Sequence, residues 1–301
     1  LAMDRVAFVE FFGKLLQVVL VTIIVRNDWG FLPIAATLLA SLSFNAIATF
    51  VLSRSFLRFS LKADVVFWRR FLTESSPLAA TALITFAYFK LDTIILSVLQ
   101  SHTDVGIYNV AYKIIENLIF FPAMLAGLIL PLLSHTLTSN QKLFQEIMDK
   151  TFKVFLLIVF PLVVGVWVLA PDIIHIISGG GFDESVRVLR ILIFALGCIF
   201  FGHYFNMLLI VSGAQKSLMK ALFIAAVVNI GLNLIFIPQY SYIAAAITSV
   251  ITELLVVLLT GTLAFRQVGF FLSLRPVLRI ALATLLMGGV MYYFDQYSFI
   301  I

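Results

Sequence analysis

The sequence predicts an all-α integral membrane protein, a bundle of many membrane-spanning helices, and three observations support this fold class. Hydrophobic residues make up 62% of the 301 residues and charged residues only 12%, whereas roughly 25% of the residues in a soluble domain are charged. Nine stretches of the sequence are mostly apolar and approach the about 20 residues that a helix needs to cross the hydrocarbon core. Basic residues between these stretches fall almost entirely in alternate loops.

The apolar stretches are too long for strands, and backbone exposed to lipid must satisfy its own hydrogen bonds, which favours helices. Because most of the connecting loops are short, consecutive spans are expected to be antiparallel neighbours. We also expect a short cytoplasmic amphipathic helix at 139–150. The predicted spans are 6–26, 31–53, 76–99, 106–133, 154–177, 186–212, 218–238, 241–264 and 277–294.

Lys and Arg predict the orientation, because cytoplasmic loops carry an excess of both. Four loops hold nearly all of them, whereas the alternate loops hold Arg26 and short polar turns. We therefore expect a multi-pass protein of the cell membrane with the N-terminal end of the chain in the cytoplasm. The net charge of +5 is dispersed over these loops, so nucleic acid is not an expected partner. The basic loop residues are Arg54, Arg58, Lys62, Arg69, Arg70, Lys142, Lys150, Lys153, Lys216, Lys220, Arg266, Arg275 and Arg279.

Motifs of enzyme sites are missing from the sequence, which has no Gly-rich phosphate loop, no His-Glu-x-x-His motif and no nucleophile with evident partners. The four histidines are scattered, and the single cysteine, Cys198, lies inside a predicted span. We therefore expect no enzymatic activity, no metal site and no cofactor.

Charged residues inside the predicted spans are the candidate functional residues. Each costs at least about 2.5–3.5 kcal/mol at the bilayer centre on insertion scales, so it needs an ion-pair partner or a water-filled cavity. Glu10 and Lys14 are four residues apart and can pair on one helix face. The full set is Glu10, Lys14, Lys90, Asp92, Lys113, Glu116, Arg187, Arg190 and Glu253.

The third and fourth predicted spans form a hairpin about a turn near residue 102. Folding the sequence about that turn places Asp92 opposite Lys113, and Lys90 near the level of Glu116. These residues are either a structural ion-pair network that holds the hairpin together or a charged wall of a substrate cavity. The two interpretations are compatible, because a group can pair in one state and meet substrate in another.

Arg187 and Arg190 are three residues apart at the start of the sixth span and share a helix face. Arg187 can reach the outer interface, and a pair of guanidinium groups suits phosphate oxygens. Asn229 and Asn233, four apart in the seventh span, are expected to hold helices together rather than bind substrate. Pro122 lies deep in the fourth span, where it bends the helix, either as ordinary packing or as a hinge.

Three stretches resemble the polysaccharide repeat-unit (O-antigen-type) flippases of the multidrug/oligosaccharidyl-lipid/polysaccharide (MOP) exporter superfamily, and together they cover most of 60–265. The first has a Lys-x-Asp span, a Val-Gly-x-Tyr-Asn turn and a span that ends in Leu-Pro-Leu-Leu-Ser. At 238–246 the chain departs from the family, which usually has glycines where Tyr240, Ser241 and Tyr242 stand. The stretches are AYFKLDTIILSVLQSHTDVGIYNVAYKIIENLIFFPAMLAGLILPLLS, ISGGGFDESVRVLRILIF and VSGAQKSLMKALFIAAVVNIGLNLIFIPQYSYIAAAITSVITE.

The resemblance implies the superfamily's architecture, two lobes of six helices around a central cavity, with an incomplete first lobe in this chain. A chain that begins with Leu and ends directly after a span looks like a fragment. The implied division is 1–53 for the last two helices of the first lobe, 54–75 for a basic cytoplasmic connector, 76–264 for a six-helix second lobe, and 265–301 for a connector and one further transmembrane helix.

The resemblance also implies a function: a flippase that moves a polyprenyl-diphosphate-linked oligosaccharide across the cytoplasmic membrane by alternating access, with proton or sodium coupling. A cation-coupled multidrug exporter of the same superfamily is the alternative, and a membrane-embedded glycan polymerase or ligase is disfavoured by the short outer loops. The partners are membrane lipid and the lipid-linked substrate. We expect substrate contacts from Lys90, Lys113, Arg187 and Arg190, coupling or ion-pair roles for Asp92, Glu116, Glu10, Lys14 and Glu253, and a hinge at Pro122.

Overall fold

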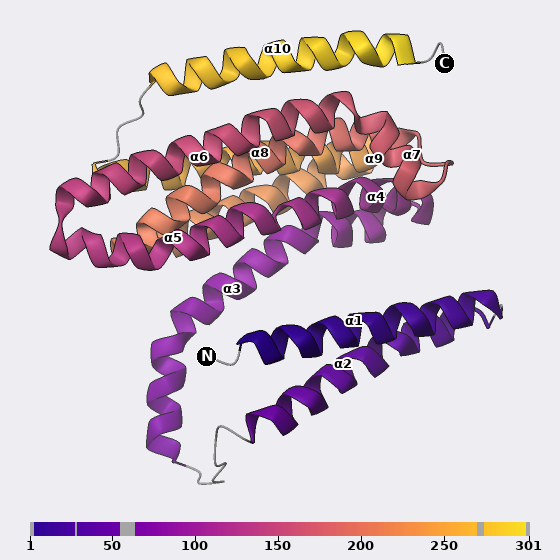
Figure 1. The fold of residues 1–301 in the computed structure, drawn as a ribbon, viewed down its shortest axis with the longest axis horizontal. Coiled ribbons are helices and arrows are strands. Elements are labelled where there is room, and N and C mark those ends of the chain that lie inside the picture. The colour runs from indigo at the N-terminus through magenta and orange to yellow at the C-terminus, as the bar shows by residue number, and fades with distance from the viewer. Residues whose placement is uncertain (1–2, 28, 55–63, 270–273, 299–301) are drawn as a thin grey trace. The chain divides into compact units, whose positions relative to one another are not determined.

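The computed structural model describes residues 3–27, 29–54, 64–269 and 274–298, which are helical apart from short turns and contain no strand (Figure 1). Parts of the two predicted connectors, 55–63 and 270–273, lie outside these residues. The chain divides into two compact units, Leu1–Arg69 and Arg70–Ile301. The helices are α1 (Met3–Arg26), α2 (Phe31–Ser53), α3 (Val65–Leu99), α4 (His102–Leu118), α5 (Phe120–Ser139), α6 (Gln141–Val168), α7 (Ala170–Ser178), α8 (Glu184–Val211), α9 (Gln215–Val268) and α10 (Leu274–Ser298).

The first unit holds a hairpin of α1 and α2. The two helices approach closely at Gly13, where a Cβ atom would collide with the side chain of Asn45. The Ser41 hydroxyl donates a hydrogen bond of 2.8 Å to the Gly13 carbonyl. Small residues let membrane helices approach this closely, so the two helices pack through backbone contact as well as through apolar side chains.

In the second unit, α8 is the central helix and contacts α4, α5, α6, α7 and α9. Its apolar residues recur on most of its faces, which is the pattern of a helix surrounded by others. Tyr204 shows why the packing is specific. Its ring lies among Phe152, Phe155 and Phe205, and its hydroxyl donates to the Met148 carbonyl at 3.1 Å. α10 lies along α6 at one edge of the bundle (Figure 1).

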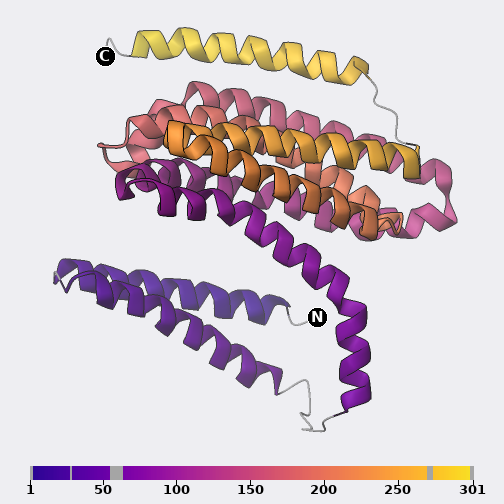
Figure 2. The same cartoon turned by 180° about the vertical axis from the view of Figure 1, so that it is seen from behind.

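α9 is two antiparallel helices joined at Ser241, which has φ of 49° and ψ of −133°. Hydrogen bonds from Asn229 to Thr252 and from Thr248 to Asn233 join the two halves, and Figure 2 shows them side by side. The predicted turn at 238–240 is therefore almost absent, because the first half stays helical to Tyr240 and the chain reverses at one residue.

The fourth predicted span, for which a bend at Pro122 is expected, is interrupted nearby, because α4 ends at Leu118 and α5 begins at Phe120. Pro122 is buried and has no N–H to donate to the carbonyl of Leu118, four residues earlier. The two helices together form a single apolar span, His102–Ser139. Whether the break acts as a hinge stays a prediction.

Six helices within the described residues are long and apolar enough to cross a membrane, and a shorter apolar helix covers Val277–Met291. Three boundaries differ from the prediction. The span expected at 154–177 is broken at Leu169, before Pro171 in the first turn of α7. The amphipathic segment 139–150 is not a separate helix, because α6 runs from Gln141, capped by Asn140, to Val168. The last part of the predicted connector at 54–75 is helical, because α3 begins at Val65.

Candidate functional site

Asp92 lies at the centre of a polar cluster inside the second unit, with 5% of its surface exposed. α3 carries it between α4 and the two halves of α9. The Asn233 side-chain amide donates to one carboxylate oxygen at 2.5 Å. The other oxygen accepts hydrogen bonds from the hydroxyls of Ser249 and, at 3.3 Å, Tyr108. All three partners are neutral, so a carboxylate here is held by hydrogen bonds without an opposite charge.

A second layer of polar groups surrounds these partners. Asn233 donates to the Asn229 side-chain oxygen at 3.0 Å, and Asn229 donates to the Thr252 hydroxyl at 3.3 Å. The Thr248 hydroxyl donates to the Asn233 side-chain oxygen. Because burial of an ionised carboxylate is costly unless it is paired, this group of oxygens favours a proton or a hard cation at Asp92.

Glu253 lies beside this cluster and is 6% exposed. It lines a small cavity of about 20 Å³ together with Asp92, Tyr112 and Ser249. A cavity of this size has room for about one water molecule. The structure thus brings together Asp92 and Glu253, two of the residues predicted to couple or pair, although they lie far apart in the sequence.

The Lys90 ammonium lies 2.6 Å from one Glu116 carboxylate oxygen, and the Lys113 ammonium lies 2.8 Å from the other. The prediction that Lys90 lies near the depth of Glu116 along the hairpin is therefore confirmed. The predicted pairing of Asp92 with Lys113 is wrong. Lys90 and Asp92 are two residues apart and point to opposite sides of α3, so Asp92 enters the core while the Lys113 side chain stays 70% exposed.

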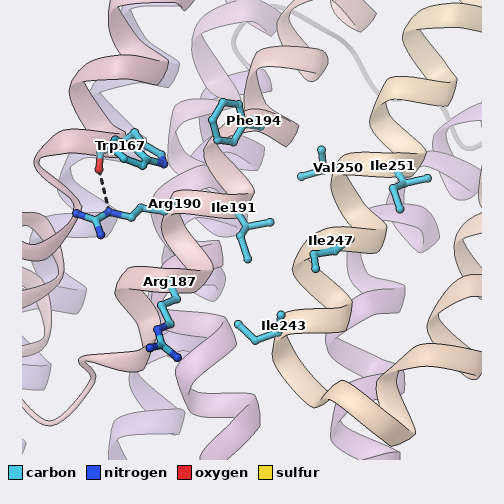
Figure 3. Close-up of a pocket in the computed structure, with 9 residues that line it drawn as sticks. All are labelled: Trp167, Arg187, Arg190, Ile191, Phe194, Ile243, Ile247, Val250 and Ile251. Atoms are coloured by element: carbon cyan, nitrogen blue, oxygen red, sulfur yellow. Dashed lines mark hydrogen bonds between the residues drawn. The ribbon is translucent and has the colours of Figure 1, made fainter. Parts of the chain in front are cut away.

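Arg187 and Arg190 line one pocket on another part of the second unit (Figure 3). The Arg190 Nε donates to the Trp167 carbonyl at 3.1 Å, and its guanidinium carbon lies 5.0 Å from the centre of the Trp167 ring. Arg187 is exposed and lies 3.7 Å from a carboxylate oxygen of Glu184. The remaining lining is apolar and comes from α8 and the second half of α9.

The two pairs of predicted substrate cations do not lie in one site. On α8, Leu192 and Ala195 line the small cavity beside Asp92, whereas Arg190 and Phe194 line the arginine pocket. Residues 190 and 192 are two apart and so face nearly opposite sides of a helix. Lys90 and Lys113 therefore belong with α3 and α4, whereas the two arginines line a separate pocket on a different face of α8.

In the first unit, the expected ion pair between Glu10 and Lys14 does not form. The Lys14 ammonium instead donates to the Gln17 side-chain oxygen at 3.4 Å. All three side chains line a groove of about 500 Å³ with Asn45 of α2. The prediction that Glu10 and Lys14 share a helix face is thus confirmed, while their direct pairing is not found.

Sequence reasoning missed Tyr108 and Ser249, and assigned Asn229 and Asn233 only to helix packing. A signal was present in the sequence: Asn229 and Asn233 in one span and Thr248 and Thr252 in the next are equally spaced about the chain reversal. That symmetry places Asn229 opposite Thr252 and Asn233 opposite Thr248, each pair at one depth on the two facing helices. Tyr108 had no such signal, because one tyrosine in an apolar span is ordinary core.

Comparisons with known proteins agree with this fold. The structure is similar to that of lipid II flippase MurJ in an inward closed conformation, with a TM-score of 0.77, 18% sequence identity, and coverage of 96% of this chain and 61% of that one. This chain therefore spans about three fifths of that protein, and the likeness shows the fold. A comparison with curated protein sequences gives no match. Residues 1–187 match the family described as polysaccharide biosynthesis protein. The fold and this match confirm the predicted fold class and the resemblance, and the chain belongs to the polysaccharide biosynthesis protein family.

Proposed function

We propose that this chain forms part of a flippase that moves a polyprenyl-diphosphate-linked oligosaccharide across the cytoplasmic membrane. Membership of the polysaccharide biosynthesis protein family supports a saccharide as part of the transported substrate. The observation that carries the proposal is the match of 96% of the chain to the fold of a protein whose description is a lipid flippase. We further propose that the basic loops face the cytoplasm and that the protein transports rather than polymerises glycans.

The lysines around Glu116 are the proposed contacts for the diphosphate. Lys90 and Lys113 both hold the same carboxylate, so the cluster carries a net charge of about +1 when all three groups are ionised. Charged side chains this exposed on a membrane-spanning helix need a water-filled cavity beside them. A diphosphate that enters such a cavity can replace Glu116 as the partner of both lysines.

The cluster at Asp92 is the proposed coupling site. It connects α3 with both halves of α9, so a cation or proton bound there holds these helices together. A ligand shifts a conformational equilibrium only by its differential affinity for the two states. A bound cation relieves the unpaired carboxylate in the packed arrangement described above, and its release favours an arrangement in which Asp92 is hydrated.

Transport by the full-length protein in proteoliposomes tests the substrate, with a fluorescent lipid-linked oligosaccharide whose exposure is read by a quencher that does not cross membranes. Lys113→Gln should slow flipping about tenfold, since a hydrogen bond to a charged group contributes about 1.5–3 kcal/mol. Lys150→Gln is a matched control. The Lys150 side chain is 71% exposed and lies 2.9 Å from Glu146, against 70% and 2.8 Å for Lys113 and Glu116.

Asp92→Asn tests the coupling in the same vesicles. It should abolish the acceleration of flipping by an imposed sodium or proton gradient, whereas Asp172→Asn, at an exposed aspartate of α7, should leave this acceleration unchanged.

Equal flipping by the Lys113 and Lys150 variants would remove the lysine cluster from the substrate site. Uptake of an organic cation drug with no flipping of the oligosaccharide would replace the proposal with the multidrug exporter.

A further inference from the structure

A groove with one charged end and one apolar end runs along α8, and we refer to it as the α8 groove. Its charged end is the pocket of about 630 Å³ that contains Arg187 and Arg190 between α6, α8 and the second half of α9 (Figure 3). A second cavity of about 490 Å³ shares Phe194 with this pocket. It continues along α8 past Cys198 and is lined by α10 through Leu285.

The apolar end is closed on one side by close helix packing. At Gly288 of α10, a Cβ atom would collide with the side chain of Val164 of α6. Phe194, Cys198 and Leu254 line the space beneath. The α8 groove therefore has the dimensions and lining of a trough for a hydrocarbon chain, whereas its mouth carries two guanidinium groups.

Arg190 is held in place without a negative partner. Its Nε donates to the Trp167 carbonyl and its guanidinium carbon lies over the Trp167 ring, which holds the terminal nitrogens at the mouth. No acidic side chain among the described residues lies within ion-pair distance of Arg190, since the pair at this end joins Glu184 to Arg187. A guanidinium inside a membrane span that lacks an anion is costly, so this site favours a negatively charged ligand.

The depth of the arginines suits a lipid phosphate. α8 begins at Glu184, directly after the glycine turn 179–181 on the expected outer side. Arg190 lies six residues further on, which is about 9 Å along a helix. The interfacial region of one leaflet is about 5–7 Å thick, so the Arg190 backbone lies about 2–4 Å below it, and the long arginine side chain extends back to the phosphates of the outer leaflet.

We propose that the α8 groove binds one anionic phospholipid of the outer leaflet, with its phosphate between Arg187 and Arg190 and an acyl chain in the trough past Phe194 toward Cys198. The transported lipid is not the expected occupant, because the α8 groove is separate from the cavity beside Asp92 and is lined by a different face of α8. The proposal depends on the membrane orientation of α8 and not on flippase activity.

Trp167 is a natural reporter for this site, because its ring centre lies 5.0 Å from the Arg190 guanidinium carbon. The chain has three tryptophans, and Trp29→Phe with Trp68→Phe leaves Trp167 alone. The full chain is reconstituted in phosphatidylcholine vesicles, and Trp167 fluorescence is measured as phosphatidylglycerol or phosphatidylcholine with brominated chains is added. We expect half-maximal quenching at an about fivefold lower mole fraction of the brominated phosphatidylglycerol.

The variants separate the charge from the trough. Arg187→Gln with Arg190→Gln should remove the preference for phosphatidylglycerol and leave quenching by brominated phosphatidylcholine unchanged. Arg26→Gln, at the exposed end of α1 on the same expected side, is the matched control and should keep the preference. An unchanged preference in the double variant would overturn the proposal.

Two further outcomes would also overturn it. Equal quenching by the two brominated lipids in the single-tryptophan protein would mean that the α8 groove does not select a negative headgroup. Displacement of brominated phosphatidylglycerol by an equimolar amount of undecaprenyl diphosphate would assign the groove to the carrier lipid, whereas retention of the phospholipid under that challenge supports the proposal.

Discussion

Asp92 is the residue whose surroundings depart most from an ordinary membrane core. Its hydrogen-bond partners lie on α4 and on both halves of α9, so the charge of one side chain bears on the packing of three helices. Neutral hydrogen bonds offset part of the burial cost of a carboxylate, and a bound cation offsets more of it. Stability and ion binding are therefore linked at this residue.

We predict that the thermal unfolding temperature in detergent rises when choline is replaced by sodium at constant ionic strength, or when the pH is lowered, and that Asp92→Asn removes this response. A ligand at about 100 times its Kd stabilises the folded state by about 2.7 kcal/mol. Asn keeps the shape of the side chain without its charge. An unfolding temperature of the unmodified protein that responds to neither sodium nor protons would exclude a coupling site at Asp92.

Ser241 is the one described residue other than glycine with a positive φ, and its side-chain oxygen is buried without a hydrogen-bond partner. Such a backbone conformation costs a residue with a Cβ about 1–3 kcal/mol, whereas glycine adopts it freely. We predict that Ser241→Gly raises the free energy of unfolding by about 1 kcal/mol, measured by titration from mild detergent into dodecyl sulfate. Ser97→Gly, in the regular helix α3, should lower it by about 0.5–1 kcal/mol.

Single residues also show what the sequence could predict. Counting residues from the turn near residue 102 gives the depth of each charge along the helices, which is why Lys90 and Glu116 were matched correctly. The count does not give the direction in which each side chain points around its helix. Asp92 was therefore assigned to Lys113, whereas the structure turns it toward Asn233 and Ser249.

At the scale of helices, hydropathy located the apolar stretches but not their breaks. Apolar residues stand on both sides of Leu169, where α6 gives way to α7. Proline alone does not predict a break either, because Pro161 lies inside the continuous α6 whereas Pro122 follows a gap between α4 and α5. A missing N–H does not always interrupt a membrane helix, because neighbouring groups can satisfy the freed backbone carbonyl.

We predict that Pro122→Ala extends the hydrogen bonds of α4 into α5 and slows transport by the full-length protein, while the free energy of unfolding stays the same or rises. Pro161→Ala is the control, because α6 is already continuous there, and it should leave the flipping rate unchanged. Flipping rate and unfolding are measured on the same preparations. Equal flipping rates of the two variants would show that the break is ordinary packing.

For the whole molecule, hydrogen bonds tie the three expected outer turns of the second unit together at one end. The Gln100 side chain donates to the Ile237 carbonyl at 2.8 Å, which joins the turn before α4 to the reversal in α9. The Ser185 hydroxyl donates to the Ile107 carbonyl at 2.7 Å and joins the start of α8 to α4. The alternation of basic loops and these contacts place the same turns at one end of the second unit.

This agreement gives a prediction for the topology. In a protein whose single native cysteine is replaced by Cys198→Ala, new cysteines at Ser101, Ser178 and Gln239 should react with an impermeant maleimide added outside intact cells. Cysteines at Lys142 and Lys216 should react only after the membrane is opened, because Lys and Arg retain their loops in the cytoplasm. An antiparallel hairpin requires that turns at its two ends lie on opposite sides, so labelling of Lys142→Cys and Ser178→Cys from the same side would contradict both the orientation and the passage of α6 through the bilayer.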